Sequence, residues 1–501
     1  MIDLREAMSE LVRAEEPRAR GSVGVRADAR NRRMRQRIAA AVLGLAVAVA
    51  ATSLAIRSFP TDDRTPKPAV PQPLNVSSLH RVWSADVPSA SVIAFQNVDA
   101  DADHVYVGTT TGVIAYPKDC ADPCPPVWRA VMVKEPSRES ASIAVGEGIV
   151  AVTLEGHLAV FGSACGIEGA LCTPLWRSDP PAGANGYLVP VIGDGVVKAT
   201  LSVGEMPDHH VWAVGFAAQC RTDGESCDPS WSGDLGLGTA FSPAPYVDGV
   251  FYQQVGLRLL GFAASCSSDG GSCQPDLLVR LDGESGSGAS VFLGPVARGG
   301  EVVVTTGTGL IQSFPAHCRE SCRPLWVGDA SEYVGGSPVR AGDLVVVSGD
   351  GGTAAFPFGC SSDGGRCAPR WASPVGSGEV IPTGDRAVVT LGGNNRSVVT
   401  VFPTDCSASC EPRWSVGDLG QIQGAESDGR TLFIAHRGQV DAYPLECADP
   451  CVSLWRADLP GETWDLLLDG RHLIAFSRLG SLSELELPDE RFVLTTFASS
   501  S

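Results

Sequence analysis

Sixteen cysteines are the residues with the clearest chemical potential in this sequence, and they fall into eight close pairs. Four pairs have the spacing C-x3-C, four have C-x6-C, and no cysteine is left over. The pairs are Cys120 with Cys124, Cys165 with Cys172, Cys220 with Cys227, Cys266 with Cys273, Cys318 with Cys322, Cys360 with Cys367, Cys406 with Cys410, and Cys447 with Cys451. Such pairs suit either local disulfides in an oxidising compartment or halves of zinc sites.

Disulfides explain these pairs better than zinc does. A zinc site needs a second pair or histidines at matching spacing, whereas the residues flanking each pair are mostly Asp, Ser, Gly and Pro. We therefore predict eight local disulfides, each worth about 2 kcal/mol in the chain-entropy model. We expect them to clamp surface turns and not to join distant parts of the fold.

Other motifs that suggest a site are weaker. Asp99, Asp101 and Asp103 have calcium-loop spacing, but no Gly and distal Glu complete that pattern. His209 and His210 are adjacent on an expected strand, where they would point to opposite faces. Asn395 begins a glycosylation sequon, which matters only in a host that glycosylates. The sequence lacks H-E-x-x-H, G-x-S-x-G and G-x-x-x-x-G-K, so we predict no catalytic residue, no metal site and no cofactor.

The elements that position the cysteines begin with an apolar segment, which every cysteine follows. Ile38 to Ile56 is a run of nineteen uncharged residues that would span about 28 Å as a helix, close to the apolar thickness of a bilayer. The run is longer than a signal-peptide core, and its basic leader is 37 residues long, so we favour an uncleaved transmembrane helix over a cleaved signal peptide.

Charge predicts the orientation of this helix. Residues 1–37 contain ten Arg and six acidic residues, which favours a cytoplasmic location for this segment and an extracytoplasmic one for everything after the helix. Residues 57–78 form a Pro-rich, extended linker. The chain carries a net charge of -19, and with +4 on residues 1–37 the remainder carries -23, which argues against a nucleic-acid partner.

A tryptophan recurs along the rest of the chain. It stands four residues after the second cysteine of seven pairs, and Leu277 takes this place once. The series comprises Trp83, Trp128, Trp176, Trp231, Trp326, Trp371, Trp414 and Trp455, with successive positions 41 to 55 residues apart once Leu277 is included. Repeats of this length are typical of propellers and solenoids.

Each repeat has the pattern of a four-stranded antiparallel unit. Short apolar strands are joined by turns such as "VIGDG" at 191–195 and "LLDGR" at 467–471, and the cysteine loop precedes the strand that begins with Trp. Because such sheets bury their faces against one another in a ring, we predict an all-β propeller over residues 79–488 with a C-terminal tail at 489–501. The eight tryptophans are then packing residues between blades.

These units resemble the quinoprotein-type, or PQQ-like, β-propellers. The resemblance rests on "PVWRA", "PLWRS", "PSWSG", "PLWVG", "PRWAS", "PRWSV" and "SLWRA", although cysteine loops replace the family's usual Asp-and-Gly turn. It implies eight blades, whereas we count nine three-strand units, so eight or nine blades are possible. A ninth blade requires the Trp83 strand to join the unit at 463–487. Enzymatic members bind PQQ and calcium beneath a disulfide between adjacent cysteines, and no two cysteines are adjacent here.

One face of this propeller is the expected ligand face. The Asp-Gly turns and cysteine loops must share one face, so the remaining connections line the other. The opposite face would gather Gly-rich segments that suit either a ligand or ordinary hairpin turns, at 108–112, 204–210, 305–309, 348–352 and 392–396.

Three functional hypotheses follow. The first is a membrane-anchored, non-catalytic scaffold, from a bacterium by its composition, that binds a protein, a peptide or an envelope polymer outside the cell. The second is a transmembrane sensor, resembling anti-sigma factors without their zinc motif, whose amphipathic residues 1–16 dock a cytoplasmic partner or lie on lipid headgroups. The third is a PQQ-dependent dehydrogenase, which the missing adjacent cysteines disfavour.

Overall fold

The computed structural model describes residues 74–88, 90, 97–166, 170–204, 210–237, 245–266, 271–282, 294–306, 308–318, 322–333, 337–349, 351–376, 378–392, 397–479 and 491–499. The predicted cytoplasmic segment 1–37, the transmembrane helix 38–56 and linker residues 57–73 lie outside these ranges. Within the described ranges, no helix has the length and apolar character needed to cross a membrane.

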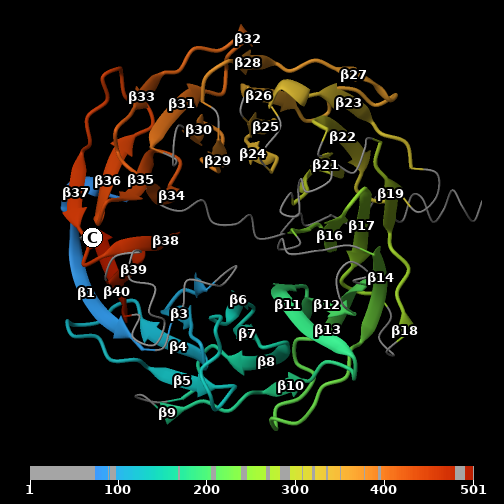
Figure 1. Ribbon diagram of the computed structural model, residues 1–501, viewed down its shortest axis with the longest axis vertical. Helices are drawn as coiled ribbons and strands as arrows, with labels where there is room; N and C mark the ends of the chain where they lie inside the picture. The colour runs from blue at the N-terminus through green and yellow to red at the C-terminus, as the bar shows by residue number, and fades with distance from the viewer. Residues whose placement is uncertain are drawn as a thin grey trace, which may run out of the picture. The chain divides into compact units, whose positions relative to one another are not determined.

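Within the unit Pro71–Ser501, the described strands form nine sheets around one axis, a nine-bladed β-propeller (Figure 1). In each blade the first strand lies nearest the centre of the ring. In blades 1 to 8 the strand that begins with Trp, or with Leu277 in blade 4, lies near the rim, and in blade 9 this place is taken by β1. Short β-branched and aromatic runs separated by tight turns favour this meander, because each strand can pair with the next in sequence. Nine blades agree with the nine repeat units of the sequence.

The strands of the first five blades are as follows. Blade 1 has β2 (Val98–Ala100), β3 (His104–Gly108), β4 (Gly112–Pro117) and β5 (Trp128–Val131). Blade 2 has β6 (Ser142–Gly146), β7 (Ile149–Leu154), β8 (His157–Gly162) and β10 (Trp176–Ser178). Blade 3 has β11 (Ala184–Gly193), β12 (Val196–Val203), β13 (His210–Ala217) and β14 (Trp231–Leu237). Blade 4 has β15 (Tyr246–Val247), β16 (Val250–Val255), β17 (Arg258–Ala263) and β19 (Leu277–Arg280). Blade 5 has β20 (Val296–Arg298), β21 (Glu301–Thr305), β22 (Leu310–Pro315) and β23 (Trp326–Asp329).

Four blades complete the ring. Blade 6 has β24 (Val339–Ala341), β25 (Leu344–Gly349), β26 (Gly352–Pro357) and β28 (Trp371–Ser373). Blade 7 has β29 (Glu379–Ile381), β30 (Ala387–Gly392), β31 (Val398–Pro403) and β33 (Trp414–Val416). Blade 8 has β34 (Ile422–Ser427), β35 (Thr431–His436), β36 (Gln439–Pro444) and β37 (Trp455–Asp458). Blade 9 has β38 (Glu462–Asp469), β39 (His472–Leu479), β40 (Arg491–Ser499) and β1 (Leu79–Val87). Two short 3-10 helices are η1 (Val76–Ser78) and η2 (Ser331–Tyr333).

The two ends of the described chain close the ring in blade 9. Strand β1 pairs antiparallel with β40 from Leu79↔Ser499 to Val87↔Phe492, and β40 also pairs with β39. The prediction of a C-terminal tail at 489–501 is therefore wrong for residues 491–499. Their sequence, RFVLTTFAS, is rich in β-branched and aromatic residues, and seven of its nine residues are buried because both faces and both edges of β40 are covered.

All sixteen cysteines form the eight expected disulfides. Each disulfide closes a local loop, as expected, and in addition several of these loops pair with the preceding blade. In blade 2, β9 (Ala170–Leu171) inside the Cys165–Cys172 loop pairs in parallel with β5 of blade 1. The strands β18 (Gly271–Ser272), β27 (Gly365–Cys367) and β32 (Ala408–Ser409) pair in the same way with β14, β23 and β28. These loops thus cover the outer edge of the preceding blade, which otherwise exposes unpaired backbone groups.

The recurring tryptophans lie between neighbouring blades. Trp176 of blade 2 is fully buried, its ring centroid lies 5.4 Å from that of Phe216 in blade 3, and its Nε1–H donates to the Ala218 carbonyl at 2.9 Å. This acceptor is the first residue after the third strand of the next blade. The same hydrogen bond joins Trp83 to Lys118, Trp128 to Ser163 and Trp414 to Leu445. These four indoles therefore supply both an apolar contact and a hydrogen bond to the next blade. Trp326 instead donates to Glu301 of its own blade and Trp455 to the Leu79 carbonyl, and the Nε1 atoms of Trp231 and Trp371 have no partner among the described residues.

Blade 4 achieves the same contact with two other residues. Tyr252 of β16 lies in register with Gly261, which is in register with Leu277 at the tryptophan position. The buried Tyr252 hydroxyl donates to the Ala316 carbonyl at 3.4 Å, which is again the first residue after a third strand. A Cβ at Gly261 would lie 3.1 Å from Tyr252 ring atoms and 3.1 Å from the Leu277 Cβ. Tyr252 and Leu277 together thus fill the volume that one indole fills elsewhere.

The Leu277→Trp substitution tests this arrangement. We expect it to destabilise the fold by about 1–3 kcal/mol, because the new indole would compete with Tyr252 for one space. Adding Tyr252→Ala should recover most of the loss, so the two changes should be strongly non-additive. Urea unfolding of the wild type, both single variants and the double variant measures the coupling. Additive effects of the two changes would contradict it.

Candidate functional site

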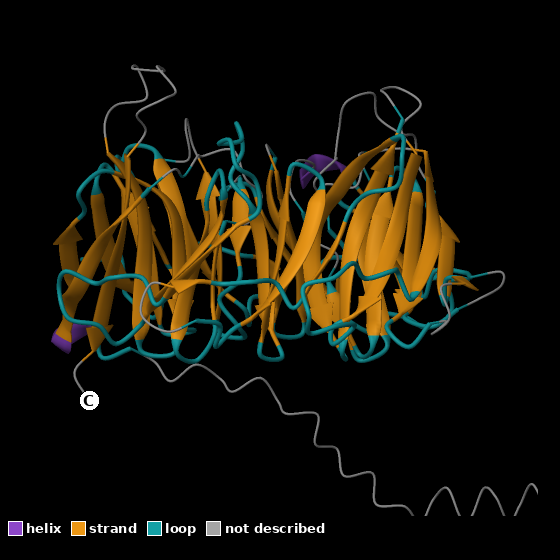
Figure 2. Ribbon diagram, turned by 90° about the horizontal axis from the view of Figure 1, so that it is seen from below, coloured by secondary structure: helices purple, strands orange, loops and turns teal. Residues whose placement is uncertain are grey.

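The propeller has two unlike faces. We call the face that carries the turns between first and second strands, together with the disulfide loops, the disulfide face, and the opposite one the far face. The described chain begins at the disulfide face, where the Leu74 backbone N–H donates to Asp428 in a first turn of blade 8 at 2.9 Å. The described chain ends at the same face, because Ser499 pairs with Leu79 directly after η1, which lies at the lower edge of Figure 2. Both ends of the described propeller therefore leave the far face free.

The Gly-rich far-face segments lie only partly within the described residues, since 205–209, 307, 350 and 393–396 are outside them. The complete segment, 108–112, has ordinary structural reasons for its glycines. A Cβ at Gly108 would lie 2.0 Å from the Ala141 carbonyl oxygen, and one at Gly112 would lie 2.1 Å from the Ala130 carbonyl oxygen. Glycine is thus required at both positions by close backbone contacts within the protein.

The Asp99, Asp101 and Asp103 run does not form a calcium loop. Asp101 accepts hydrogen bonds from the Tyr106 hydroxyl at 2.6 Å and from two backbone N–H groups of its own turn. Asp99 instead accepts from the Val145 backbone N–H of blade 2 at 2.8 Å. No group of three potential metal ligands occurs among the described residues. Asp101 therefore organises the turn, and Asp99 organises the contact between blades 1 and 2.

Three partly buried carboxylates lie on the innermost strands of consecutive blades: Glu426 in blade 8, Asp465 in blade 9 and Asp99 in blade 1. Burial raises the pKa of all three groups, to about 7 for Glu426 and for Asp465. Repulsion from Asp465 raises the pKa of Glu426 further, and Asp99 acts in the same way on Asp465. Glu426 and Asp465 can therefore take up protons near neutral pH, but the geometry of the row defines no ligand.

A His–Asp pair in blade 8 has residue types that also occur in catalytic sites, but both side chains are fully engaged in hydrogen bonds within the protein. The Asp441 carboxylate contacts His436 Nε2 at 3.1 Å, the Tyr443 hydroxyl at 3.2 Å and Arg456 Nε at 2.6 Å. His436 Nδ1 contacts the Leu419 carbonyl at 2.9 Å, so both ring nitrogens are occupied. Burial would raise the pKa of Asp441, but hydrogen bonds from His436 and Arg456 outweigh it and lower the pKa to about 2. The cluster is a saturated structural network.

A second repeating position at the far face was missed from the sequence. Within a blade, the first residue of the third strand lies beside a residue of the outer strand. This outer-strand residue stands three positions after the tryptophan and is Asp in five blades. His157 contacts Asp179 at 2.8 Å in blade 2, and His210 contacts Asp234 at 2.7 Å in blade 3. Equivalent pairs are Gln439 with Asp458 at 3.3 Å and Arg491 with Asp86 at 3.4 Å. The recurring pattern W-x-x-D could have identified the aspartate from the sequence. The residue that contacts this aspartate became evident only from the pairing of the strands.

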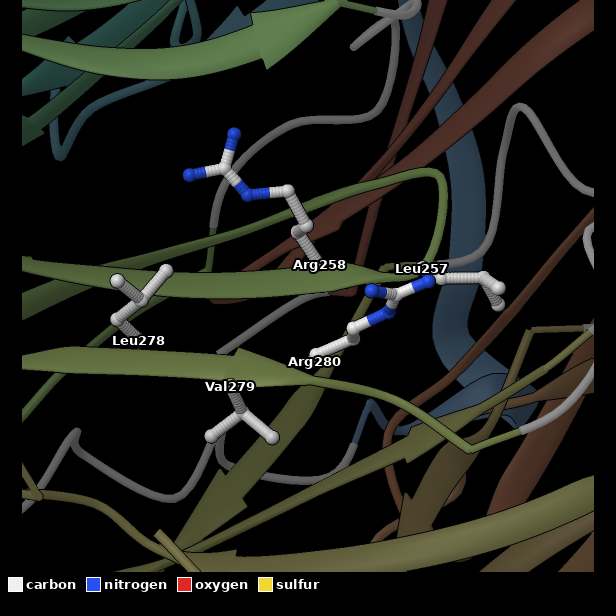
Figure 3. Close-up of a pocket in the computed structure, with 5 residues that line it drawn as sticks. All are labelled: Leu257, Arg258, Leu278, Val279 and Arg280. Atoms are coloured by element: carbon white, nitrogen blue, oxygen red, sulfur yellow. The ribbon is translucent and has the colours of Figure 1, made fainter. Parts of the chain in front are cut away.

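Blade 4 breaks this pattern with two arginines. Arg258 and Arg280 occupy the two equivalent positions and are direct partners in the register of β17 and β19. They line a cavity of about 470 Å³ together with Leu257, Leu278 and Val279 (Figure 3). The side chains of Arg258, Leu278 and Arg280 project to the same side of the two strands, and Leu278 is 43% exposed. This is the candidate binding site that the described residues define best.

Comparison with known proteins finds only distant similarity to solved structures. No family model matches the chain, and no curated protein matches it. Similar solved structures include BamB from Moraxella catarrhalis, with 12% identity, a TM-score of 0.45, and coverage of 84% of this chain and 99% of that one. The designed protein Ika8 has 10% identity, a TM-score of 0.44, and coverage of 83% and 98%. Sqt1 from Saccharomyces cerevisiae has 10% identity, a TM-score of 0.43, and coverage of 84% and 99%. The predicted β-propeller is confirmed by the nine sheets of the structure itself, and these distant similarities say nothing about its ligand.

Lys198, a buried lysine between blades 3 and 4, lowers the stability of the folded protein. Lys198 of β12 is almost completely buried, and its Nζ donates to Thr200 Oγ1 at 3.0 Å and to Gln253 Oε1 of blade 4 at 2.9 Å. Burial lowers the pKa of Lys198 from 10.5 to about 7. Folding at pH values between these two therefore removes a proton from the lysine, which opposes folding.

We predict that Lys198→Met stabilises the protein at pH 7 by about 2 kcal/mol, the desolvation relieved being larger than the two hydrogen bonds lost. The unfolded lysine binds its proton up to pH 10.5, so the penalty is largest at and below pH 7 and declines as pH rises. The advantage of the variant should shrink between pH 7 and pH 10. Thermal unfolding across this range, with Lys134→Met as an exposed control, measures it. An advantage that is constant with pH would contradict the assignment.

Proposed function

We propose that this chain is a non-catalytic binding scaffold, anchored in the cell membrane by residues 38–56, with its propeller on the outer, oxidising side. The observation that carries the proposal is the set of eight closed disulfides with no free cysteine in the propeller. Structural disulfides of this density persist in oxidising compartments and are rare in the cytosol. The basic residues 1–37 are then cytoplasmic.

The place where the chain joins the propeller supports a role in presentation. The described chain begins at the disulfide face, with Leu74 bonded to Asp428 and η1 leading into β1. A tether that joins at this face leaves the far face unobstructed. We propose that the far face meets a protein, a peptide or an envelope polymer.

The polar clusters of the described blades support a non-catalytic role. His436 is held on both ring nitrogens, and His157 and His210 each pair with a strand-edge aspartate. These contacts stabilise hairpins and present no activated nucleophile beside a base. Residues 1–37, on which the sensor hypothesis depends, lie outside the described residues.

Labelling with a membrane-impermeant maleimide tests the location. The full chain in sealed right-side-out membrane vesicles should resist labelling at all sixteen cysteines until a reductant is added, and should then be labelled. In sealed inside-out vesicles, an impermeant reductant and maleimide should give no labelling. Labelling without reductant, or labelling only from the cytoplasmic side, would overturn the proposed location.

Reconstitution tests the non-catalytic role. We expect the purified full chain, supplied with PQQ and calcium, to retain no cofactor absorbance after gel filtration and to reduce no dye with alcohols or sugars. Retained cofactor together with turnover would establish the dehydrogenase alternative instead.

A further inference from the structure

We propose that the cavity at the far-face edge of blade 4 binds an oxyanion, a carboxylate or a phosphate, that carries an apolar chain. We call it the blade-4 cavity, defined by Leu257, Arg258, Leu278, Val279 and Arg280. The inference goes beyond the proposed scaffold role and does not depend on where the chain resides.

The charge arrangement provides the first argument. Where blades 2 and 3 pair a histidine with an aspartate, blade 4 places Arg258 directly opposite Arg280. Like charges facing each other across two strands are destabilising. Among the described residues, neither arginine forms an ion pair with an acidic side chain. An oxyanion between them would relieve the repulsion and accept several charge-assisted hydrogen bonds.

One of the two arginines is held in place by the protein. Arg258 Nη1 donates to the Leu235 carbonyl of blade 3 at 3.1 Å. The neighbouring Gly236 leaves the room for this guanidinium, because a Cβ there would lie 2.2 Å from Nη1. Arg280 is exposed and can adjust to a ligand. A fixed guanidinium beside an adjustable one costs less ordering on binding than two free side chains.

The walls of the cavity provide the argument for an apolar chain. The apolar surface open to a ligand comes from half-buried Leu257 and from Leu278, which is 43% exposed although it belongs to a strand, whereas the Val279 side chain is buried in the core. A volume of about 470 Å³ lies in the range of about 300–1,000 Å³ that is typical of small-molecule sites. A small inorganic anion would leave this apolar surface in water. An acyl or alkyl chain attached to the anion would cover it.

Isothermal titration calorimetry on the full chain in detergent-free nanodiscs tests the proposal. The probes are octanoate and octyl phosphate, with octyltrimethylammonium as the cationic control, and acetate and inorganic phosphate as controls without a chain. The variants are Arg280→Ala, the pair Arg258→Ala with Arg280→Ala, the pair Arg258→Lys with Arg280→Lys, and Leu278→Asp. The matched control is Arg129→Ala, an exposed arginine on the outer strand of blade 1. Binding to the discs is subtracted with empty discs.

We expect octanoate, octyl phosphate or both to bind, and the preferred probe identifies the oxyanion. Arg280→Ala should weaken binding at least fivefold, the double alanine variant and Leu278→Asp at least tenfold, and the lysine pair less than the alanine pair. Arg129→Ala should bind as the wild type does. Since Arg280 is exposed, its alanine variant should keep the wild-type unfolding temperature, which separates lost binding from lost folding. Absence of binding, equal binding of the cationic amphiphile, equal binding of the chainless anions, or unchanged binding by the alanine variants would overturn the proposal.

Discussion

The contact on which the propeller depends is the one between an outer-strand aromatic and the next blade. A four-stranded sheet has two apolar faces, and each blade buries them only if its neighbours hold a fixed distance and tilt. The indole sets both, because its ring packs on an aromatic side chain of the next third strand. For Trp83, Trp128, Trp176 and Trp414 its N–H also reaches the carbonyl that follows that strand. Blade 4 shows that this geometry is the constraint, since Tyr252 and Leu277 reproduce the same apolar volume and the same acceptor, Ala316.

Two further structural features stabilise the ring: the strands in the disulfide loops and the closure of blade 9. Disulfide loops pair along the outer edge of the preceding blade and so cover strand edges that would otherwise be exposed. At the junction of blades 9 and 1, β1 joins β40, and ion pairs link Lys118 with Asp469 and Asp119 with Arg471 across the same junction. Blade 9 thus combines the two ends of the propeller, so that neither end leaves an unpaired strand inside the ring.

The sequence predicted the repeat well because its signals are local. Cysteine spacing, tryptophan spacing and Asp-Gly turns each lie within one repeat, and they gave the blades, the disulfides and the face that each loop occupies. The extent of blade 9 was predicted wrongly because β40 carries no cysteine loop or tryptophan, and its partner β1 lies some four hundred residues away in the chain. The role of Asp441 and the pairing of Arg258 with Arg280 were also missed. Both depend on which residues face each other across strands, which a one-residue shift in register would change.

Amide hydrogen exchange of β1 and β40, followed by mass spectrometry on the folded chain, tests the closed nine-bladed ring most directly. If the ring closes as described, peptides covering 79–87 and 491–499 exchange as slowly as the central strands of blades 2 and 7, because their amides pair with each other. If these peptides exchange at the rate of the surface loops while the other blades stay protected, the ninth blade does not close the ring and this account of the architecture is wrong.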